Sequence, residues 1–273
     1  MPTISIITAA YAPKSDFLPA TADGVRAQVL PAGWDVEWVV QEDGADPSLE
    51  AFFHDVPNAR YGANGVQLGI SATRNLALTR ARGRLVQVLD HDDVLLPGAL
   101  ATLLAAFERH EIHWAVGAAD DLLPDGTRKA WDSALPFGLV KAGEANAWAE
   151  AHGGNWPVHC AGLLVRTDSL RAVGGWASSP VDDDLVAFAA LSELGDGWNE
   201  QAVTWLYRQH AGQTTRSDAL VGLRDAGRLM ALQRVKALRG AGMVFAPAAP
   251  LGFDGRSHDV NLLGNIKPPA SLG

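Results

Sequence analysis

A short apolar segment that ends abruptly in acidic residues constrains this chain more than any other feature. Residues 85–89 are almost wholly apolar, and they are followed directly by Asp90, His91, Asp92 and Asp93. A continuous apolar run is typical of a strand buried on both faces of a parallel sheet. The mutual repulsion of the clustered carboxylates at its end must be reduced by solvent, by protonation or by a bound cation. At the rim of an α/β sheet, Asp-x-Asp suits a divalent cation, which in turn can hold a phosphate.

The composition is that of a folded acidic protein. The chain has 273 residues, of which 48% are hydrophobic, so it is long enough to bury a substantial core. Its formal net charge of −9 argues against binding to nucleic acid or to an anionic membrane surface. Its single cysteine excludes an internal disulfide. Neither a signal peptide nor an integral membrane segment is evident, so we expect a soluble cytoplasmic protein.

Strand-like and helix-like segments alternate in the first 110 residues. Ser71 is expected to cap the start of the second helix, and Gly83 is expected to follow its end. This alternation is the signature of parallel βαβ units. The pattern predicts strands over 4–11, 36–40 and 84–89, and helices over 16–30, 72–81 and 97–110.

After residue 111 the alternation becomes irregular. From residue 240 the chain is rich in Gly, Pro and Ala, which predicts loops or a tail. We therefore predict an α/β fold with a Rossmann-like, mostly parallel central sheet flanked by helices, and a mixed C-terminal half. The segments expected in that half are a hairpin over 114–127, strands over 158–165 and 202–207, and helices over 141–152, 184–194 and 220–239.

Two polar positions in the N-terminal half admit two interpretations each. Asp43-Gly44 follows the second strand, either as an ordinary turn or as a carboxylate that contacts a nucleobase or ribose. Arg74 falls on the first turn of a helix, where the dipole disfavours a cation. It is either a solvated side chain or an arginine directed at a diphosphate.

Two further positions lie late in the chain. Asp182, Asp183 and Asp184 follow a proline, and they are either a favourable helix start or the location of a general base. His210 follows a late strand. A lone histidine is usually an ordinary surface or core residue. The cation expected at the acidic motif, however, lacks a third protein ligand, and a histidine at a strand end could supply it.

The order of these features resembles the family-2 glycosyltransferases of the GT-A fold, over roughly residues 3 to 217. The resemblance implies a GT-A domain over 1–217, with a nucleotide-binding half (1–110) and an acceptor-binding, catalytic half (111–217). Residues 218–273 would form a C-terminal helix and a loop-rich tail. The matching features are 43–44 after a strand, 69–75 (Gly-Ile-Ser-Ala-Thr-Arg-Asn), 90–93 after a strand, 174–176 (Gly-Gly-Trp), the acidic 182–184, and 208–210 (Arg-Gln-His).

The resemblance implies a metal-dependent, inverting transfer of a sugar from a nucleotide-diphosphate donor to a hydroxyl group. The expected donor is a UDP-sugar, the expected cofactor is Mn²⁺ or Mg²⁺, and the acceptor is unidentified. Thr8, Ala10 and Tyr11 would lie along the nucleotide. Asp43 would contact the base, and Arg74 would lie near the diphosphate or the base.

The same resemblance implies roles for the acidic motif and the late histidine. Asp90 would face the ribose or the donor sugar, with His91 also on the donor side. Asp92 would ligate the metal, and His210 would complete metal or diphosphate binding.

Two departures from the family pattern leave assignments open. Residues 41–45 (Gln-Glu-Asp-Gly-Ala) stand where Asp-Asp-Gly-Ser is commoner, so the contact at Glu42 is undecided. The general base matches Asp183, with Asp182 and Asp184 as alternates, because three aspartates are consecutive.

Other functions fit parts of the sequence. Residues 90–94 also match the Asp-x-Asp-x-Val pattern of haloacid-dehalogenase-type phosphatases, with Asp90 as nucleophile and Asp92 as acid/base. That motif normally follows the first strand of its domain, whereas here two predicted strands precede it. A nucleotide-sugar-binding protein without catalysis is the second alternative. A nucleotidyltransferase is disfavoured because no glycine-rich, lysine-containing phosphate loop is visible near the N-terminus.

Overall fold

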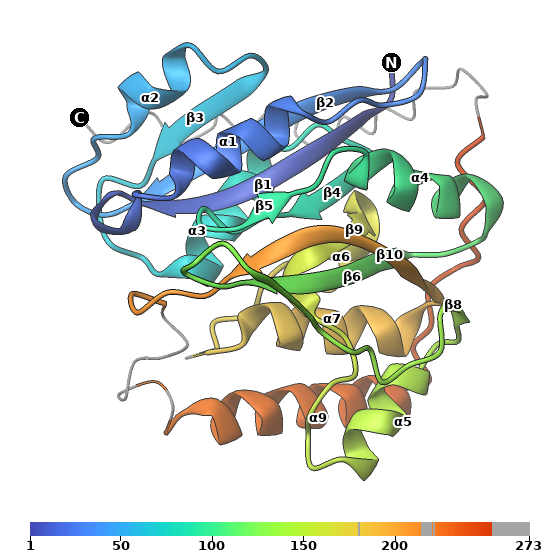
Figure 1. Ribbon diagram of the computed structural model, residues 1–273. Coiled ribbons are helices and arrows are strands. Elements are labelled where there is room, and N and C mark those ends of the chain that lie inside the picture. The colour runs from blue at the N-terminus through green and yellow to red at the C-terminus, as the bar shows by residue number, and fades with distance from the viewer. Residues whose placement is uncertain (180, 214–219, 221, 253–273) are drawn as a thin grey trace, which may run out of the picture.

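The computed structural model describes residues 1–179, 181–213, 220 and 222–252. Within these residues, ten strands form one twisted sheet through the middle of the molecule, with helices on both faces (Figure 1). The strand order is β3-β2-β1-β4-β9-β6-β10-β5, with β7 paired to β6 and β8 paired to β10. The sheet therefore continues from the N-terminal half of the chain into the C-terminal half.

The N-terminal half supplies the parallel part of the sheet. β1 lies in the centre of this part, parallel to both β2 and β4, and β2 is parallel to β3. Such an arrangement requires crossover helices, and the chain provides them between the strands. The bounds are β1 Thr3–Tyr11, β2 Asp35–Asp43, β3 Ala59–Ala63 and β4 Leu85–Val88 for the strands, and α1 Leu18–Arg26, α2 Glu50–His54 and α3 Ile70–Arg80 for the helices.

The C-terminal half supplies the mixed part. β9 lies between β4 and β6 and is antiparallel to both, so it joins the two halves of the sheet. β10 is parallel to β6, and β5, β7 and β8 are short antiparallel strands beside them. The bounds are β5 Val94–Leu95, β6 Trp114–Leu122, β7 Arg128–Ala130, β8 Gly138–Val140, β9 Leu163–Arg166 and β10 Gly197–Arg208.

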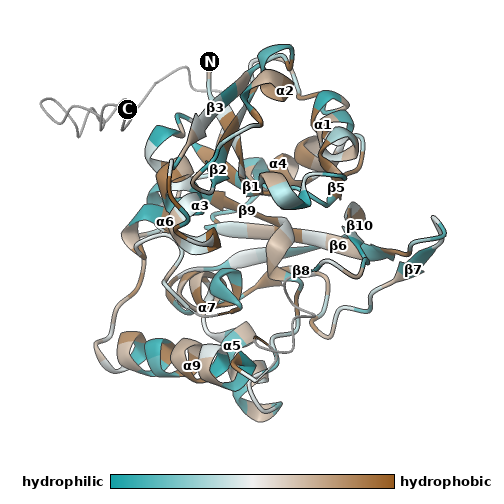
Figure 2. Cartoon of the chain, turned by 90° about the vertical axis from the view of Figure 1, so that its left-hand side faces the viewer, coloured by the Kyte–Doolittle hydropathy of each residue, from teal (hydrophilic) through white to brown (hydrophobic). Residues whose placement is uncertain are grey.

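A separate apolar core lies on each face of the sheet. α1, α2 and α4 cover one face, and α3, α5, α6 and α7 cover the other, with α9 packed outside α7 as a second layer. Hydrophilic residues gather on the outer turns of the helices (Figure 2). None of the described helices is long and apolar enough to cross a membrane. The remaining bounds are α4 Ala99–Arg109, α5 Glu144–Ala151, α6 Thr167–Ala172, α7 Asp183–Leu194 and α9 Arg224–Gly240.

The predicted α/β class, the parallel N-terminal sheet and the mixed C-terminal half are confirmed. The predicted strands and longer helices are present with shifted ends. β10 extends further at both ends than predicted, and β9 begins only after the 3₁₀ turn at Cys160–Gly162. The short elements α2, β3, β5, β8 and α6 lie where no element was predicted. Residues 253–273 of the predicted tail lie outside the described residues.

Two details predicted around α3 are wrong. The residue before the helix is Gly69, at φ 86°, while Ser71 is buried inside the first turn and caps nothing. The helix ends at Arg80, and the next residue, Ala81, is extended. Gly83 therefore does not terminate the helix. Its backbone N–H instead donates to the Ser5 hydroxyl at 2.8 Å, where the chain passes close to β1.

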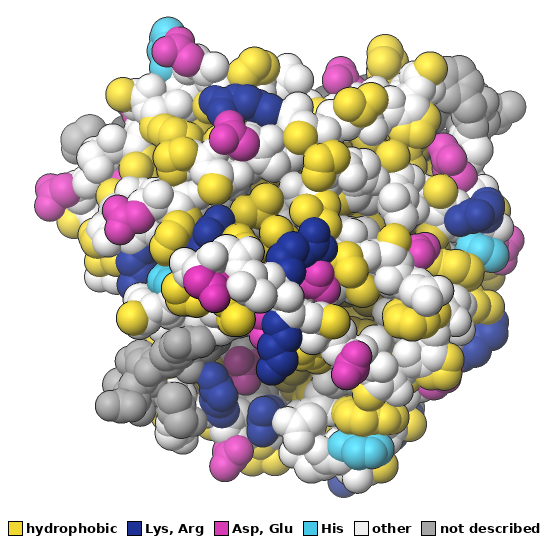
Figure 3. Space-filling view, viewed as in Figure 1, with side chains coloured by type: hydrophobic (Ala, Val, Ile, Leu, Met, Phe, Trp, Pro, Cys, Tyr) yellow, Lys and Arg dark blue, Asp and Glu magenta, His cyan; other side chains and the backbone are white. Residues whose placement is uncertain are grey.

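The surface is hollowed below the middle of the face seen in Figure 3, between α7 and α9. Both Lys or Arg and acidic side chains gather around this hollow. The carboxyl ends of β1, β2 and β4 lie above it in the same view (Figure 1). This side of the molecule therefore combines the sheet edge expected to carry a site with a concave surface.

Replacing Gly83 by alanine should lower the free energy of unfolding by about 1–3 kcal/mol, the usual effect of overpacking. A Cβ there would lie 2.6 Å from the backbone nitrogen of Ser5, which cannot move without disturbing β1. Urea denaturation measures the change. Gly240→Ala is the matched control, because its Cβ meets no atom within 4 Å. Equal stability of the two variants would contradict this account.

Candidate active site

The ends of three parallel strands place polar residues along one edge of the sheet. β1 and β2 are paired in register to their last residues, so that Tyr11 lies opposite Asp43. β4 lies on the other side of β1 and leads directly into residues 90–93. The sequence prediction that these segments meet at one sheet edge is thereby confirmed.

Arg74 lies at the centre of this edge and is buried. Its guanidinium Nη1 donates to Asp183 Oδ2 at 2.9 Å, and Nη2 donates to Asp90 Oδ1. Burial by itself lowers the pKa of the guanidinium, but the charges of Asp183 and Asp90 raise the pKa above its ordinary value. The two carboxylates therefore compensate both for desolvation and for the unfavourable position of a cation in the first turn of α3.

Asp92 and His210 meet on the same edge. His210 follows β10, and its Nε2 lies 2.9 Å from Asp92 Oδ2. The His210 ring also packs against Phe17, with 4.8 Å between the ring centroids. The predicted metal ligands, which are 118 residues apart in the chain, are therefore neighbours.

Arg208 fixes the turn that carries these ligands. Its Nε donates to the carbonyl oxygen of Asp92 at 2.8 Å, and its backbone N–H donates to Asp93 Oδ1 at 2.9 Å. Asp93 is buried, and its Oδ2 has no hydrogen-bond partner among the residues that the structure describes. Burial, followed by the charges of Asp92 and Asp90, raises the pKa of the Asp93 carboxyl well above its usual value.

Two acidic residues at the end of β2 hold loops. Asp43 accepts the backbone N–H groups of Leu68 at 2.6 Å and Gly69 at 3.0 Å, so its carboxylate fixes the segment that leads into α3. Glu42 is buried and accepts the backbone N–H groups of Ser48 and Leu49, both at 2.9 Å. Glu42, which the sequence left undecided, thus has a structural role in the next loop.

The other residues predicted beside the nucleotide differ in exposure. Thr8 is buried, and its hydroxyl donates to the carbonyl oxygen of Leu89 at 2.8 Å and accepts from Trp38 Nε1 at 2.9 Å. Its side chain therefore serves the core. Ala10 is also buried, whereas Tyr11 is half-buried at the strand end. His91 is half-buried, with its ring nitrogen Nε2 bound to a loop carbonyl at 2.9 Å.

The three consecutive aspartates have different environments. Asp182 precedes α7 with φ 56° and ψ 39°, a left-handed conformation that is uncommon for a residue with a side chain. Asp183 is buried and ion-paired with Arg74. Asp184 forms no ion pair with a described residue, and burial, followed by the charge of Asp183, raises its pKa to about 7.

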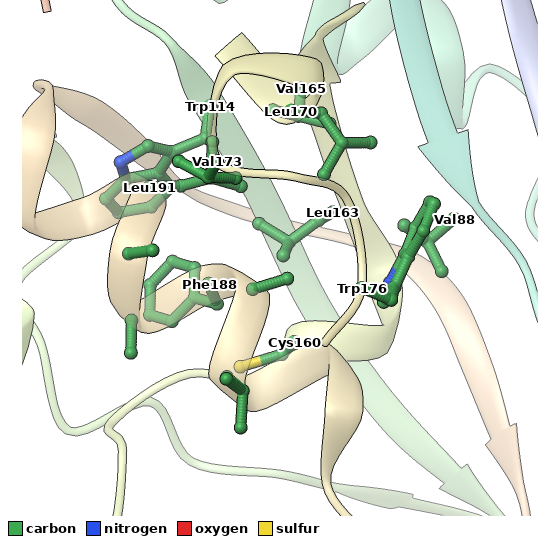
Figure 4. Packing of buried hydrophobic residues seen from close by; sticks show 14 of the residues in the cluster. Val88, Trp114, Cys160, Leu163, Val165, Leu170, Val173, Trp176, Phe188 and Leu191 are labelled. Carbon is green, nitrogen blue, oxygen red and sulfur yellow. The ribbon is translucent and has the colours of Figure 1, made fainter. Parts of the chain in front are cut away.

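The position of these aspartates depends on the packing of α7 against the sheet. Figure 4 shows Phe188 of α7 beside Trp114 of β6, and their rings meet edge to face at 4.9 Å between centroids. Leu163 of β9 and Cys160 lie in the same cluster. A helix held by such a buried face presents its first turn in one orientation, which suits a site that requires accurate geometry.

Asp182 and Asp184 open into a cavity of about 400 Å³. We call this space the α7–α9 cavity. The sequence did not predict the participation of His159, whose pKa is lowered to about 4 by burial. It lay within a segment interpreted as a plain strand. Besides the two aspartates, the cavity is lined by Trp131, Gly154, Asn155, Trp156, Val158, His159, Cys160, Leu185, Arg224 and Arg228.

The site holds few protein ligands for a metal. Among the described residues, no group of three or more His, Cys, Asp or Glu side chains is arranged to bind one. Asp92 and His210 form a pair, at side-chain exposures of 21% and 17%. A cation held there would need further ligands from a bound substrate or from water, which is a common mode for Mg²⁺.

Comparison with known proteins identifies relatives of the sequence. The model of "Glycosyl transferase family 2" matches residues 5–165. The uncharacterized protein y4gI of Sinorhizobium fredii is 26% identical over 149 residues, which are 50% of this chain and 16% of that protein. The uncharacterized protein MT1568 of Mycobacterium tuberculosis is 38% identical over 86 residues, which are 31% of this chain and 27% of that protein. The chain thus matches only a minor part of either relative.

Solved structures resemble the fold. S. aureus TarS 1–349 in complex with UDP-GlcNAc has a TM-score of 0.63 at 15% identity, and the match covers 80% of this chain and 61% of that one. The same protein in complex with UDP has a TM-score of 0.61 at 14% identity, over 88% and 72% of the two chains. At such identities the likeness shows a shared fold.

Arg74→Met should lower the free energy of unfolding by about 3–5 kcal/mol, because it leaves the buried carboxylate of Asp183 and the half-buried carboxylate of Asp90 without their cation. Arg128→Met is the matched control. Arg128 pairs with Asp120 at the surface, with a side-chain exposure of 44%, and its loss should change stability by less than about 1 kcal/mol. Urea denaturation of both variants tests the difference. Similar losses of unfolding free energy in the two variants would show that the ion pairs of Arg74 do not stabilise the fold more than a surface ion pair does.

Proposed function

The chain belongs to glycosyl transferase family 2 and has the GT-A fold, and from this premise we propose that it transfers a sugar from a UDP-sugar to a hydroxyl group with inversion. One observation carries the proposal. Residues that are distant in the sequence, namely Arg74, Asp90, Asp92, Asp184 and His210, converge on one sheet edge beside a cavity. The bound UDP-GlcNAc and UDP in the similar TarS structures support the choice of donor.

The donor would bind at the ends of β1, β2 and β4. Tyr11 and Asp43 would lie along the nucleoside, since they close the paired ends of β1 and β2. Arg74 would attract the diphosphate, which carries the negative charge that a guanidinium binds well. Asp90, now ion-paired with Arg74, would face the ribose or the donor sugar.

A divalent cation would be held by Asp92 and His210. The carboxylate of Asp92 suits Mg²⁺ or Mn²⁺. Two protein ligands leave coordination positions for diphosphate oxygens, as is usual for Mg²⁺ sites. When bound, the ion would neutralise charge that develops on the leaving diphosphate.

The general base in this proposal is Asp184. Asp183, the residue that best matched the family motif, has its carboxylate bound to Arg74 and would act as a positioning residue. Asp184 lines the α7–α9 cavity, and its pKa of about 7 suits a group that accepts a proton near neutral pH. The proposal therefore selects one of the two alternates that the sequence left open.

The proposed reaction is a single displacement. The acceptor hydroxyl oxygen attacks the anomeric carbon, while its proton moves to the carboxylate of Asp184. The bond between the anomeric carbon and the diphosphate oxygen breaks, and its electron pair leaves with the diphosphate. Arg74 stabilises the charge of this leaving group, a contribution worth about 3–4 kcal/mol for a well-placed donor in other enzymes.

The phosphatase interpretation of residues 90–94 loses its support. The motif follows β4, and three other strands precede β4, whereas in those phosphatases the motif follows the first strand. Asp90 is ion-paired with a buried arginine, which leaves it poorly placed as a nucleophile. The family match covers the motif in full.

UDP should bind to the protein, and Mn²⁺ should strengthen the binding. Asp92→Ala should weaken binding in the presence of Mn²⁺ by about tenfold or more, equivalent to about 1.4 kcal/mol, and should abolish the effect of the metal. Isothermal titration calorimetry with UDP, with and without Mn²⁺, measures both. Asp120→Ala is the control, because it removes a carboxylate of β6 that is not among the proposed metal ligands. An affinity unaffected by metal or by Asp92→Ala would overturn the metal assignment.

Asp184→Asn should lower kcat by about 10²–10⁴-fold, the usual contribution of a general base, with little change in UDP affinity. The assay is release of UDP from a UDP-sugar with water as the acceptor. Wild-type kcat should fall below pH 7, because a protonated Asp184 cannot accept a proton. The variant should lack this acid limb.

Asp182→Asn and Asp183→Asn are the controls for that experiment. Asp183→Asn should disturb Arg74 and therefore weaken UDP binding as well as turnover. If Asp184→Asn kept full activity while Asp183→Asn lost turnover alone, then Asp183 would be the base.

A further inference from the structure

Helix α9 forms one wall of the α7–α9 cavity, although it lies beyond the residues that the family model matches. Arg224 and Arg228, one turn apart, bring two guanidinium groups to this wall. Both side chains are half-buried. The cavity that adjoins the proposed base therefore has a positively charged rim that belongs to this chain's own C-terminal region.

The charge of Arg228 is only partly balanced by the described residues, although Arg224 and Arg228 both act on Asp182. Their positive charges lower the pKa of Asp182, but burial is the larger effect and leaves that pKa raised. The described part of the chain offers Arg228 no hydrogen bond or ion pair. His159 stays neutral near pH 7, since burial holds its pKa at about 4. A half-buried guanidinium without a direct partner favours an anionic ligand.

The rest of the cavity suits a sugar ring. Trp131 is half-buried at its wall, and Trp156 is held by a hydrogen bond from its indole nitrogen to Asn146 Oδ1 at 2.8 Å. The half-buried face of Trp131 offers apolar area that a sugar ring can cover, whereas Trp156 is buried and belongs to the core. The volume of about 400 Å³ is in the range of small-molecule pockets.

We propose that the acceptor is a carbohydrate bearing a phosphate or carboxylate group, which Arg224 and Arg228 bind while the attacked hydroxyl lies at Asp184. This rests on the proposed function and specifies its acceptor. The arginines lie on α9 and Asp184 lies in the first turn of α7, so the anionic group and the reacting hydroxyl would contact different walls of the cavity. An acceptor without the anionic group would bind in the same cavity but more weakly.

Calorimetric titration of the full chain, saturated with UDP and Mn²⁺, tests the proposal with matched probes. The probes are glucose, glucose 6-phosphate and glucuronic acid, and the last two distinguish phosphate from carboxylate. Saturating UDP prevents the anionic probes from occupying the donor site. At least one anionic probe should bind tenfold or more tightly than glucose.

Arg228→Gln should reduce the affinity for the anionic probe to that for glucose and leave the affinity for glucose unchanged. Arg224→Gln should act in the same direction and serves as a second variant. Lys236→Gln is the matched control, because it removes one positive charge from the exposed side of the same helix. Circular dichroism verifies that each variant is folded.

The outcomes separate failure of this inference from failure of the proposed function. If UDP itself does not bind, the proposed function fails. If UDP binds but glucose and the anionic probes bind equally, or none binds, the acceptor proposal is overturned. If Arg228→Gln weakens binding of every probe to the same degree, then the arginine only offsets the charge of Asp182, and the proposal is again overturned.

Discussion

The buried guanidinium of Arg74 is the constraint on which the site depends. It is held between Asp90, which follows β4, and Asp183, which begins α7, so one side chain joins the end of the parallel sheet to the first turn of α7. Burying an arginine is unfavourable unless its charge is compensated, and two carboxylates at this point provide the compensation. The relative position of the donor edge and the proposed base is therefore maintained by the same interaction that stabilises the fold there.

The two sides of the site are built differently. The proposed donor side consists of the ends of parallel strands, where backbone pairing determines position, as with Tyr11 opposite Asp43. The proposed acceptor side consists of a helix start, a loop and α9, which side-chain packing holds together. A scaffold of this kind keeps the chemistry of the donor constant and leaves the acceptor wall open to variation, because loops and added helices can change without altering the sheet.

Much of the fold, and the placement of polar residues at the strand ends, could be predicted from the sequence, because apolar runs ending in polar residues mark strand ends. The acidic motif at Asp90 was placed correctly for this reason. Local signals were misleading where long-range packing determines the conformation. Ser71 looked like a helix cap, and Gly83 looked like a helix end. Gly83 is instead required because the chain passes close to β1 there. No local pattern could distinguish Asp184 from its neighbours or show that His159 lines a cavity.

The pKa of the proposed base reflects its burial and its neighbour Asp183, which Arg74 holds in place. Arg74 binds Asp183 and Asp90 directly and affects the adjacent Asp184 only through its field. Burial, followed by the charge of Asp183, raises the pKa of Asp184 toward neutrality. The three consecutive aspartates therefore differ in role: the second is ion-paired with Arg74, the third is the proposed base, and the left-handed backbone of Asp182 turns the chain into the helix that holds both.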